Sequence, residues 1–188
     1  MTETPAAPTA SPRPAPPDAL SAQRPGVWVV LPTYDEAENI GPISAAILAA
    51  LPDATLLVVD DESPDGTGRL ADDLAAADPR IRVRHRAAKQ GLGRAYLDGF
   101  GVALAGGATT VVQMDADFSH DPAALPSLVA PIADGSADLV IGSRYTKGGG
   151  VVDWGLGRRV VSRVGAFRRI HNRRCLVRGY KACRHRRR

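Results

Sequence analysis

Short apolar runs alternate with helix-forming segments along this chain, and the alternation constrains the fold more than any other feature. Runs typical of buried strands occupy residues 27–31, 55–59, 81–84, 111–114 and 138–141. Stretches that favour helix lie between the first four runs, at about residues 36–51, 67–77 and 92–104. Strands that alternate with helices across short loops predict an α/β fold, with a mainly parallel sheet and helices on both faces. We further expect Thr67 to cap the second helix.

The first 25 residues differ in composition from the rest of the chain. They consist mainly of Pro, Ala, Ser and Thr, which cannot bury enough apolar surface to offset the entropy lost on ordering. The whole chain has 188 residues and is 44% hydrophobic, which suits one ordinary domain. We therefore expect a disordered leader over residues 1–25, one α/β domain over residues 26–163, and an atypical Arg-rich tail over residues 164–188.

Positive charge is concentrated at the C-terminal end. Residues 158–188 contain thirteen Lys and Arg and no acid, whereas the preceding residues hold eleven basic residues against all twenty acidic ones. Basic runs favour anionic partners, either nucleic acid or a membrane surface. Because the sequence has neither interleaved aromatic residues nor a recognisable reading helix or sheet, we expect no nucleic acid and instead peripheral contact with an anionic membrane.

The sequence contains no apolar run of about 18 residues, the length needed to cross a bilayer, and no signal-peptide pattern at its start. Two cysteines, Cys175 and Cys183, are too few for a disulfide framework and match no standard zinc spacing. We expect reduced thiols and a cytoplasmic protein at the inner face of the membrane.

Two carboxylates separated by one residue follow the fourth predicted strand. In extended chain, residues i and i+2 point to the same side, so Asp115 and Asp117 can face one cation. Carboxylate oxygens suit a hard ion such as Mg²⁺ or Mn²⁺, which bridges phosphate oxygens. Taken alone, the Asp-x-Asp pattern is a weak signal, because Asp-rich surface turns also produce it.

Polar residues also follow other predicted strands, and the carboxyl ends of parallel strands share one edge of the sheet, where ligands bind. The residues concerned are Tyr34, Asp35, Glu36, Asp60, Asp61, Asp115, Asp117 and Arg144. Acids gathered at one edge repel each other unless a cation or ligand donors compensate, so the pattern predicts a metal and a hydroxyl-rich substrate. The structural alternative is that Asp60 and Asp61 cap the next helix while Tyr34 packs.

Five segments, in this order and spacing, resemble the dolichol-phosphate (polyprenol-phosphate) mannosyltransferases, which are family 2 glycosyltransferases of the GT-A fold. The segments are LPTYDE at 31–36, VDDESPDGT at 59–67, KQGLG at 89–93, DADFSH at 115–120 and GSRY at 142–145. The resemblance covers about residues 27–163 and implies a GT-A (Rossmann-like) sheet. It implies inverting, metal-dependent transfer of mannose from GDP-mannose to a polyprenyl (dolichyl-type) monophosphate, giving polyprenyl phosphate β-mannose. A membrane-anchoring partner protein is a further expectation.

The resemblance also implies roles for individual residues. Positions matching nucleotide, sugar or phosphate contacts are Pro32, Tyr34, Glu36, Val59, Asp61, Asp115, Ala116, Asp117, Arg144, Arg159 and Ser162, with Asp115 and Asp117 as metal ligands. Cleaving the sugar–diphosphate bond builds negative charge on the leaving group. A metal at Asp117 and the guanidinium of Arg144 would stabilise that charge, which makes these two residues the expected catalytic pair.

The sequence departs from the family after about Val164. An aliphatic helix and strand and an Asp-Leu-Thr-Gly-Gly-Phe-like segment are expected there, but the chain is Arg-rich, and residues 178–181 are only a faint counterpart. We expect a fold truncated or altered at its C-terminus, either through a changed reading frame or as a genuine short form whose basic tail binds anionic lipid. Losing the last sheet element would expose an edge. Two functional alternatives stay open: a related transferase using another donor such as UDP-glucose, and an inactive membrane-surface binding form.

Overall fold

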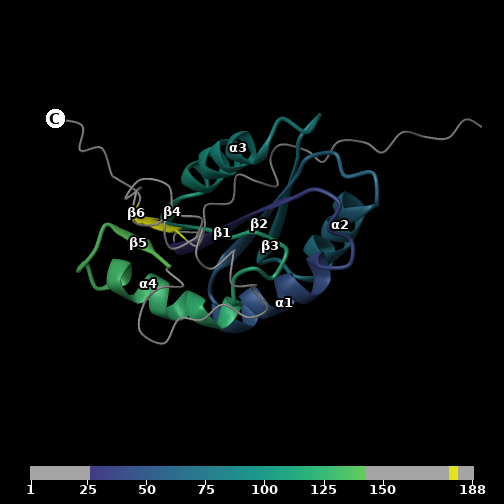
Figure 1. The fold of residues 1–188 in the computed structure, drawn as a ribbon. Coiled ribbons are helices and arrows are strands. Elements are labelled where there is room, and N and C mark those ends of the chain that lie inside the picture. The colour runs from purple at the N-terminus through teal and green to yellow at the C-terminus, as the bar shows by residue number, and fades with distance from the viewer. Residues whose placement is uncertain (1–25, 143–177, 182–188) are drawn as a thin grey trace, which may run out of the picture.

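The computed structural model describes residues 26–142 and 178–181, which form one six-stranded sheet in the order β3-β2-β1-β4-β6-β5 (Figure 1). The strands are β1 (Gly26–Thr33), β2 (Thr55–Asp60), β3 (Ile81–His85), β4 (Ala108–Gln113), β5 (Leu139–Ile141) and β6 (Arg178–Lys181). Strands β1 to β4 are parallel, and β6 is antiparallel to both β4 and β5. The predicted mainly parallel sheet is therefore confirmed. The leader over residues 1–25 and most of the tail over 164–188 lie outside the described residues.

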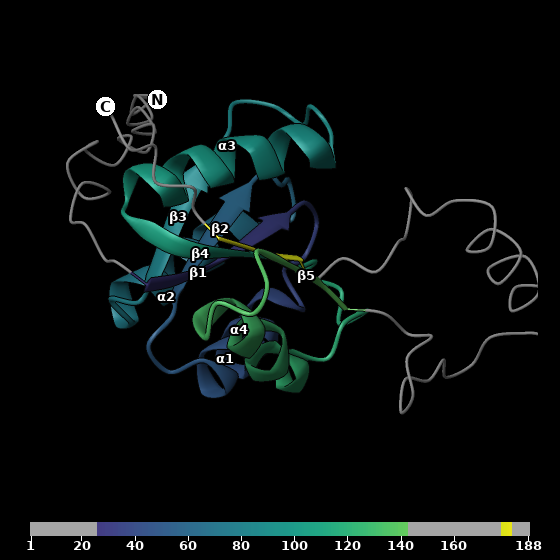
Figure 2. The same ribbon diagram turned by 90° about the vertical axis from the view of Figure 1, so that its left-hand side faces the viewer.

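Helices cover both faces of the sheet, as predicted (Figure 2). One face carries α1 (Ile40–Ala50), α2 (Thr67–Ala77) and α4 (Leu125–Ala133), and the other carries α3 (Leu92–Ala105). Successive strand residues point to opposite faces, so β1 serves two cores. Val29 and Leu31 pack with the three-helix layer, whereas Trp28 and Val30 pack under α3. Such two-sided burial explains why the strand sequences are continuously apolar.

One glycine of α3 packs directly against the sheet. A Cβ atom at Gly99 would lie 3.0 Å from the Cγ2 atom of Val59 and closer still to Cγ1 of Val30. Any larger residue would push the helix outward. The close packing fixes the start of α3, and with it the loop before it, next to the carboxyl ends of β1 and β2.

Two details of the predicted helices are wrong. The first helix begins at Ile40 rather than near Glu36, because the Glu36 carbonyl accepts from the backbone N–H groups of Asn39 and Ile40 in a turn. Thr67 does not cap α2, since Gly66 is the N-cap residue and makes no side-chain cap. The Thr67 hydroxyl instead accepts from the Glu36 N–H at 2.9 Å and donates to Asp65 at 2.6 Å. It thereby joins the loops that follow β1 and β2.

Three elements are additional to those expected from sequence, and the first is the short 3-10 helix η2 (Pro122–Ala124). Helix α4 carries Pro126 in its first turn, where a missing N–H costs nothing, and Pro131 inside. Strand β6 lies between β4 and β5, so β5 forms the outer edge of the sheet built by the described strands. Strand β6 therefore covers the edge of β4, which loss of the last sheet element would have exposed. Within the described residues, no helix is both long and apolar enough to cross a membrane.

Candidate functional site

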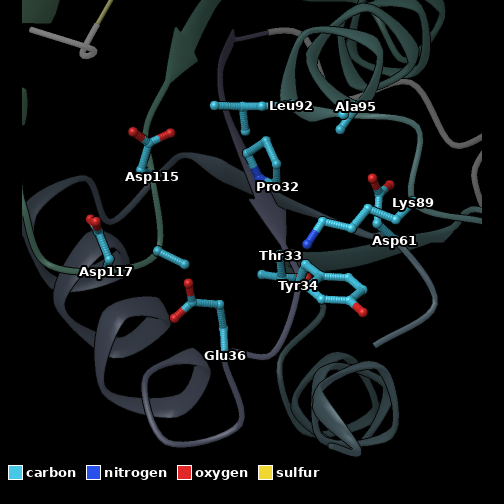
Figure 3. A pocket seen from close by; sticks show the side chains of 12 residues that line it. Pro32, Thr33, Tyr34, Glu36, Asp61, Lys89, Leu92, Ala95, Asp115 and Asp117 are labelled. Atoms are coloured by element: carbon cyan, nitrogen blue, oxygen red, sulfur yellow. The ribbon is translucent and has the colours of Figure 1, made fainter. Parts of the chain in front are cut away.

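A pocket of about 280 Å³ lies at the carboxyl ends of β1, β2 and β4 (Figure 3). The residues that line it are Pro32, Thr33, Tyr34, Glu36, Asp61, Lys89, Gly91, Leu92, Ala95, Asp115, Ala116 and Asp117. Seven of these were singled out from the sequence: Pro32, Tyr34, Glu36, Asp61, Asp115, Ala116 and Asp117. The structure therefore brings together residues from three strand ends, as the sheet topology predicts. Their individual binding roles stay predictions.

Among the described residues, one predicted site residue does not line the pocket. Val59 is completely buried in the core beneath α3, so its side chain faces other apolar groups. Arg144, Arg159 and Ser162 lie outside the described residues, and the predicted role of Arg144 at the diphosphate stays a prediction with them.

The loop after β4 presents the two carboxylates of the Asp-x-Asp segment in different ways. Asp115 is half-buried, and its Oδ1 atom accepts a hydrogen bond of 2.6 Å from the hydroxyl of Tyr96 on α3. Asp117 is exposed and accepts from the N–H and the hydroxyl of Ser119, at 2.9 and 2.7 Å. Phe118, with φ of +54°, turns the chain between Asp117 and Ser119. Asp115 is therefore held by a distant helix and Asp117 by its own turn.

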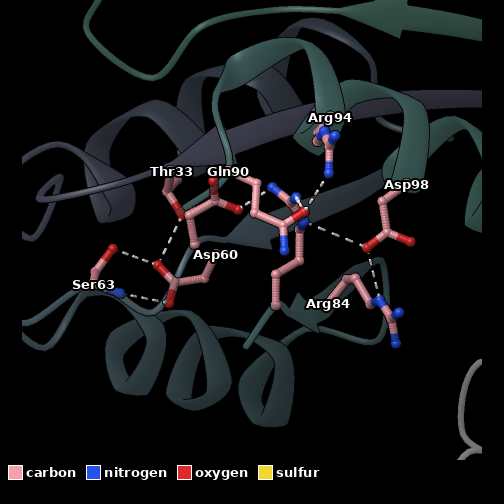
Figure 4. A network of polar contacts seen from close by, with 9 residues as sticks. Thr33, Asp60, Ser63, Arg84, Gln90, Arg94 and Asp98 are labelled. Carbon is pink, nitrogen blue, oxygen red and sulfur yellow. Dashed lines mark hydrogen bonds and ion pairs between the residues drawn. The ribbon is translucent and has the colours of Figure 1, made fainter. Parts of the chain in front are cut away.

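The acids at the end of β2 divide between structure and pocket. Asp60 is buried and accepts from the Thr33 hydroxyl at 3.1 Å and from the N–H and hydroxyl of Ser63, at 3.1 and 2.6 Å (Figure 4). It does not line the pocket, so the interpretation of Asp60 as a ligand-facing acid is wrong. The alternative that Asp60 caps the next helix is also wrong, because α2 has Gly66 as its N-cap residue and no side-chain cap. Asp61 does line the pocket, but the guanidinium of Arg86 hydrogen-bonds its Oδ1 atom.

Arg86 links Asp61 to the loop and helix that follow β3. Its Nε atom lies 3.8 Å from a carboxylate oxygen of Asp98, and its second terminal nitrogen lies 3.5 Å from Oε1 of Gln90 (Figure 4). Arg94 also reaches Gln90, at 3.2 Å. The side chain of Arg86 is only 9% exposed, which makes its pair with Asp61 a buried one. The network holds the glycine-bearing loop against the pocket.

Acids outnumber bases around the pocket. Among the described lining residues, Glu36, Asp61, Asp115 and Asp117 are acidic, and Lys89 is the single base. The Nζ atom of Lys89 lies 3.3 Å from the centre of the Tyr34 ring, in a cation–π contact. In Figure 3 this pair and Asp61 lie on one side of the pocket, opposite Asp115, Asp117 and Glu36. The side formed by Asp115 and Asp117 is thus the more negative.

The two carboxylates after β4 fit a divalent cation that is completed by a substrate. No group of three His, Cys, Asp or Glu suited to a metal occurs within residues 26–142 and 178–181. Mg²⁺ commonly binds one or two carboxylates together with substrate phosphates and retained waters. The donor set of Asp115 and Asp117, at the mouth of a pocket with excess negative charge, meets that requirement.

Sequence reasoning missed Tyr96 and Arg86. The buried positions of α3 are Ala95, Tyr96, Gly99 and Ala103, and among them only Tyr96 carries a polar group. The sequence did contain a signal for Tyr96. It is a hydroxyl-bearing residue on a helix face of otherwise small apolar residues, and it follows a glycine-bearing loop closely. Burial raises the pKa of the Tyr96 hydroxyl far above its ordinary value, with the Asp115 charge as the second cause. The hydroxyl is therefore protonated and donates to Asp115.

Comparison with protein families and characterised proteins gives consistent matches. The family described as glycosyl transferase family 2 matches residues 28–185. Over 136 residues the chain is 52% identical to polyprenol monophosphomannose synthase of Mycolicibacterium smegmatis, covering 72% of this chain and 51% of that protein. Over 141 residues it is 45% identical to undecaprenyl-phosphate mannosyltransferase of Micrococcus luteus, covering 75% and 57%. The chain thus spans about half the length of these curated relatives. The resemblance found in the sequence is confirmed.

Solved structures agree on the fold. Glucosyl-3-phosphoglycerate synthase from Mycobacterium tuberculosis matches with a TM-score of 0.55 at 24% identity, covering 87% of this chain and 59% of that one. The crystal structure of a mycobacterial protein matches with a TM-score of 0.54 at the same identity, covering 87% of this chain and 55% of that one. These likenesses confirm the expected α/β architecture.

Proposed function

Because the chain belongs to glycosyl transferase family 2, we propose that it transfers mannose from GDP-mannose to a polyprenyl monophosphate with the help of a divalent cation. The observation that carries the proposal is the pair Asp115 and Asp117 at the pocket, with no basic side chain bonded to either within the described residues. Two relatives named for mannose transfer to polyprenyl-type phosphates support the choice of sugar and acceptor.

In the donor half of the reaction, the protein must stabilise negative charge on the leaving group. Breaking the bond between the sugar and the diphosphate leaves a nucleoside diphosphate with added negative charge. A divalent cation, when bound, would offset that charge, and the carboxylates of Asp115 and Asp117 would hold the ion. Arg144, which follows β5 in sequence, is proposed to add a guanidinium to the same diphosphate.

The acceptor half needs little help from acid–base groups. A phosphate monoester is already ionised near neutral pH, so its oxygen can attack the anomeric carbon without a strong general base. The new C1–O bond forms as the bond to the leaving diphosphate breaks. Attack opposite that group inverts the anomeric centre, so an α-linked donor gives a β-linked mannosyl phosphate.

The proposal extends to location. A polyprenyl phosphate lies in a membrane, and the thirteen basic residues at positions 158–188 are suited to an anionic lipid surface. We place the protein in the cytoplasm, peripheral at the inner face of the membrane, with a membrane-anchoring protein as a further candidate partner. Sedimentation with anionic vesicles, comparing the full chain with one lacking residues 164–188, tests the lipid contact.

The direct test is transfer of radiolabelled mannose from GDP-mannose to a short polyprenyl phosphate, with Mg²⁺, Mn²⁺ or chelator. We expect lipid-linked product that needs the cation and is abolished by Asp117→Ala. Asp73→Ala, which removes an exposed acid from α2, is the matched control and should leave the product unchanged. Labelled UDP-glucose tested in parallel would give product instead if the donor is wrong. Failure of the wild-type chain with both donors would overturn the proposal.

A further inference from the structure

We propose that Tyr96 is a positioning residue that holds Asp115 in the orientation required to bind the donor and its cation. The inference rests on the proposed function, because it assigns a task to a residue behind the same pocket. Tyr96 itself does not line the pocket, whereas Asp115 does. Tyr96 therefore acts through Asp115 and is not a catalytic residue.

The contact joins a buried tyrosine and a half-buried carboxylate from separate elements. Tyr96 is 5% exposed and lies on α3, while Asp115 follows β4, nineteen residues further along the chain. The 2.6 Å distance between the Tyr96 hydroxyl and Oδ1 of Asp115 is short for a hydroxyl bond, as expected for a charged acceptor. The Tyr96 ring also contacts Phe100, at 5.9 Å between centroids, which restricts its movement.

A neutral donor suits this place better than a basic one. A hydrogen bond from Tyr96 fixes one carboxylate oxygen without cancelling the charge, whereas Arg86 neutralises Asp61. Within the described residues, no other side chain bonds Asp115, which also lines the pocket. The arrangement combines a fixed geometry with a carboxylate that no described basic group neutralises, which is what a cation-binding carboxylate needs.

The test measures binding of GDP to the full chain by calorimetry, with and without Mn²⁺, so that it does not depend on turnover. Tyr96→Phe keeps the ring and removes only the hydroxyl. We expect it to weaken GDP binding in the presence of Mn²⁺ by about tenfold, the effect of losing one hydrogen bond to a charged group. Ser44→Ala, which removes a buried hydroxyl from α1, is the matched control and should change nothing.

The decisive comparison is the double variant. If Tyr96 acts through Asp115, Tyr96→Phe should cause no further loss once Asp115→Ala has removed its target. An equal tenfold loss in both backgrounds would show a general packing role and overturn the inference, as would unchanged binding in Tyr96→Phe. If the wild-type chain binds no GDP with or without Mn²⁺, the proposed function fails and this inference fails with it. The wild-type measurement therefore separates the two failures.

Discussion

The two acidic strand ends of this protein look alike in sequence and differ in how their charges are compensated. After β2, Asp60 accepts three hydrogen bonds and Asp61 contacts the guanidinium of Arg86. After β4, Asp115 and Asp117 receive hydrogen bonds only from neutral groups within the described residues. The first end is therefore satisfied by the protein itself. At the second, no basic group among the described residues compensates the two carboxylates, which is a reason for a cation to bind there.

This difference indicates which acids at a sheet edge belong to a ligand-binding site. The number of carboxylates at a sheet edge is a poor guide, because acids there also hold loops together. The identity of the hydrogen-bond donor is a better one, since a neutral donor fixes a carboxylate and leaves its charge for a ligand. Four experiments test whether the two ends differ as described.

The largest effect is expected from removing charge after β4. Asp117→Asn keeps an acceptor for Ser119 but loses the charge, so mannosyl transfer should fall about 10³-fold, or about 4 kcal/mol in kcat/KM. The free energy of unfolding should change by less than about 0.5 kcal/mol, because Asp117 is exposed. Steady-state kinetics and urea denaturation measure the two quantities. A large loss of stability would mean that Asp117 is structural, like Asp60.

Breaking the ion pair after β2 should act on stability. Arg86→Met leaves Asp61 buried without its cation, so we expect a loss of about 3 kcal/mol in the free energy of unfolding. Arg84→Met is the matched control, because the Arg84 side chain is 44% exposed and pairs with Asp98 at the surface. It should cost less than about 1 kcal/mol. Equal losses in the two variants would contradict the distinction between buried and exposed pairs.

Asp60 should also be a stability residue. Asp60→Ala leaves the Thr33 hydroxyl and the two Ser63 donors without their acceptor, which should cost about 2 kcal/mol in the free energy of unfolding. Chemical denaturation of this variant beside Asp117→Ala provides the comparison. If the two alanine variants are equally stable, the strand ends do not differ in the way we describe.

The smallest effect is a pH dependence in the loop after β2. Hydrogen bonds from Thr67 are the main cause that lowers the pKa of Asp65 below its ordinary value of 3.8. A lowered pKa in the folded state gives stability that is present above pH 3.8 and is lost as the pH falls through the lower, folded value. The Tm advantage of wild type over Asp65→Asn should therefore be constant near neutrality and shrink below pH 3.8. A Tm advantage that grows on acidification would contradict a lowered pKa of Asp65 in the folded state.

Local patterns predicted most of the sheet, whereas long-range contacts decided the rest. The strands β1 to β5 follow from short apolar runs, which are a property of neighbouring residues. Strand β6 has the sequence Arg-Gly-Tyr-Lys, and it is a strand because β4 and β5 pair with it on either side. Helix α4 was missed because its two prolines disguise a helical pattern. The early start predicted for α1 failed because loop contacts from Thr67 and Asp65 hold the preceding residues.

The same division holds for the site. Pocket residues that directly follow strands, such as Tyr34, Asp61 and Asp115, could be located from the sequence because topology brings strand ends together. Tyr96 and Arg86 could not, since each matters through a partner 19 or 25 residues away in the chain. Asp60 and Asp61 are neighbours with identical side chains, and only the fold reveals that one faces inward and the other faces the pocket.

The place of β6 in the sheet has a consequence for how the chain assembles. Strand β5 ends at residue 141, but it joins the sheet through β6, which begins at residue 178. Until those later residues have been synthesised, β4 has an unpaired edge and β5 has no neighbouring strand. Pairing over such a separation is slow, and open strand edges promote association between chains. The nascent domain thus depends on its last described strand both to complete the sheet and to shorten the period in which it can aggregate.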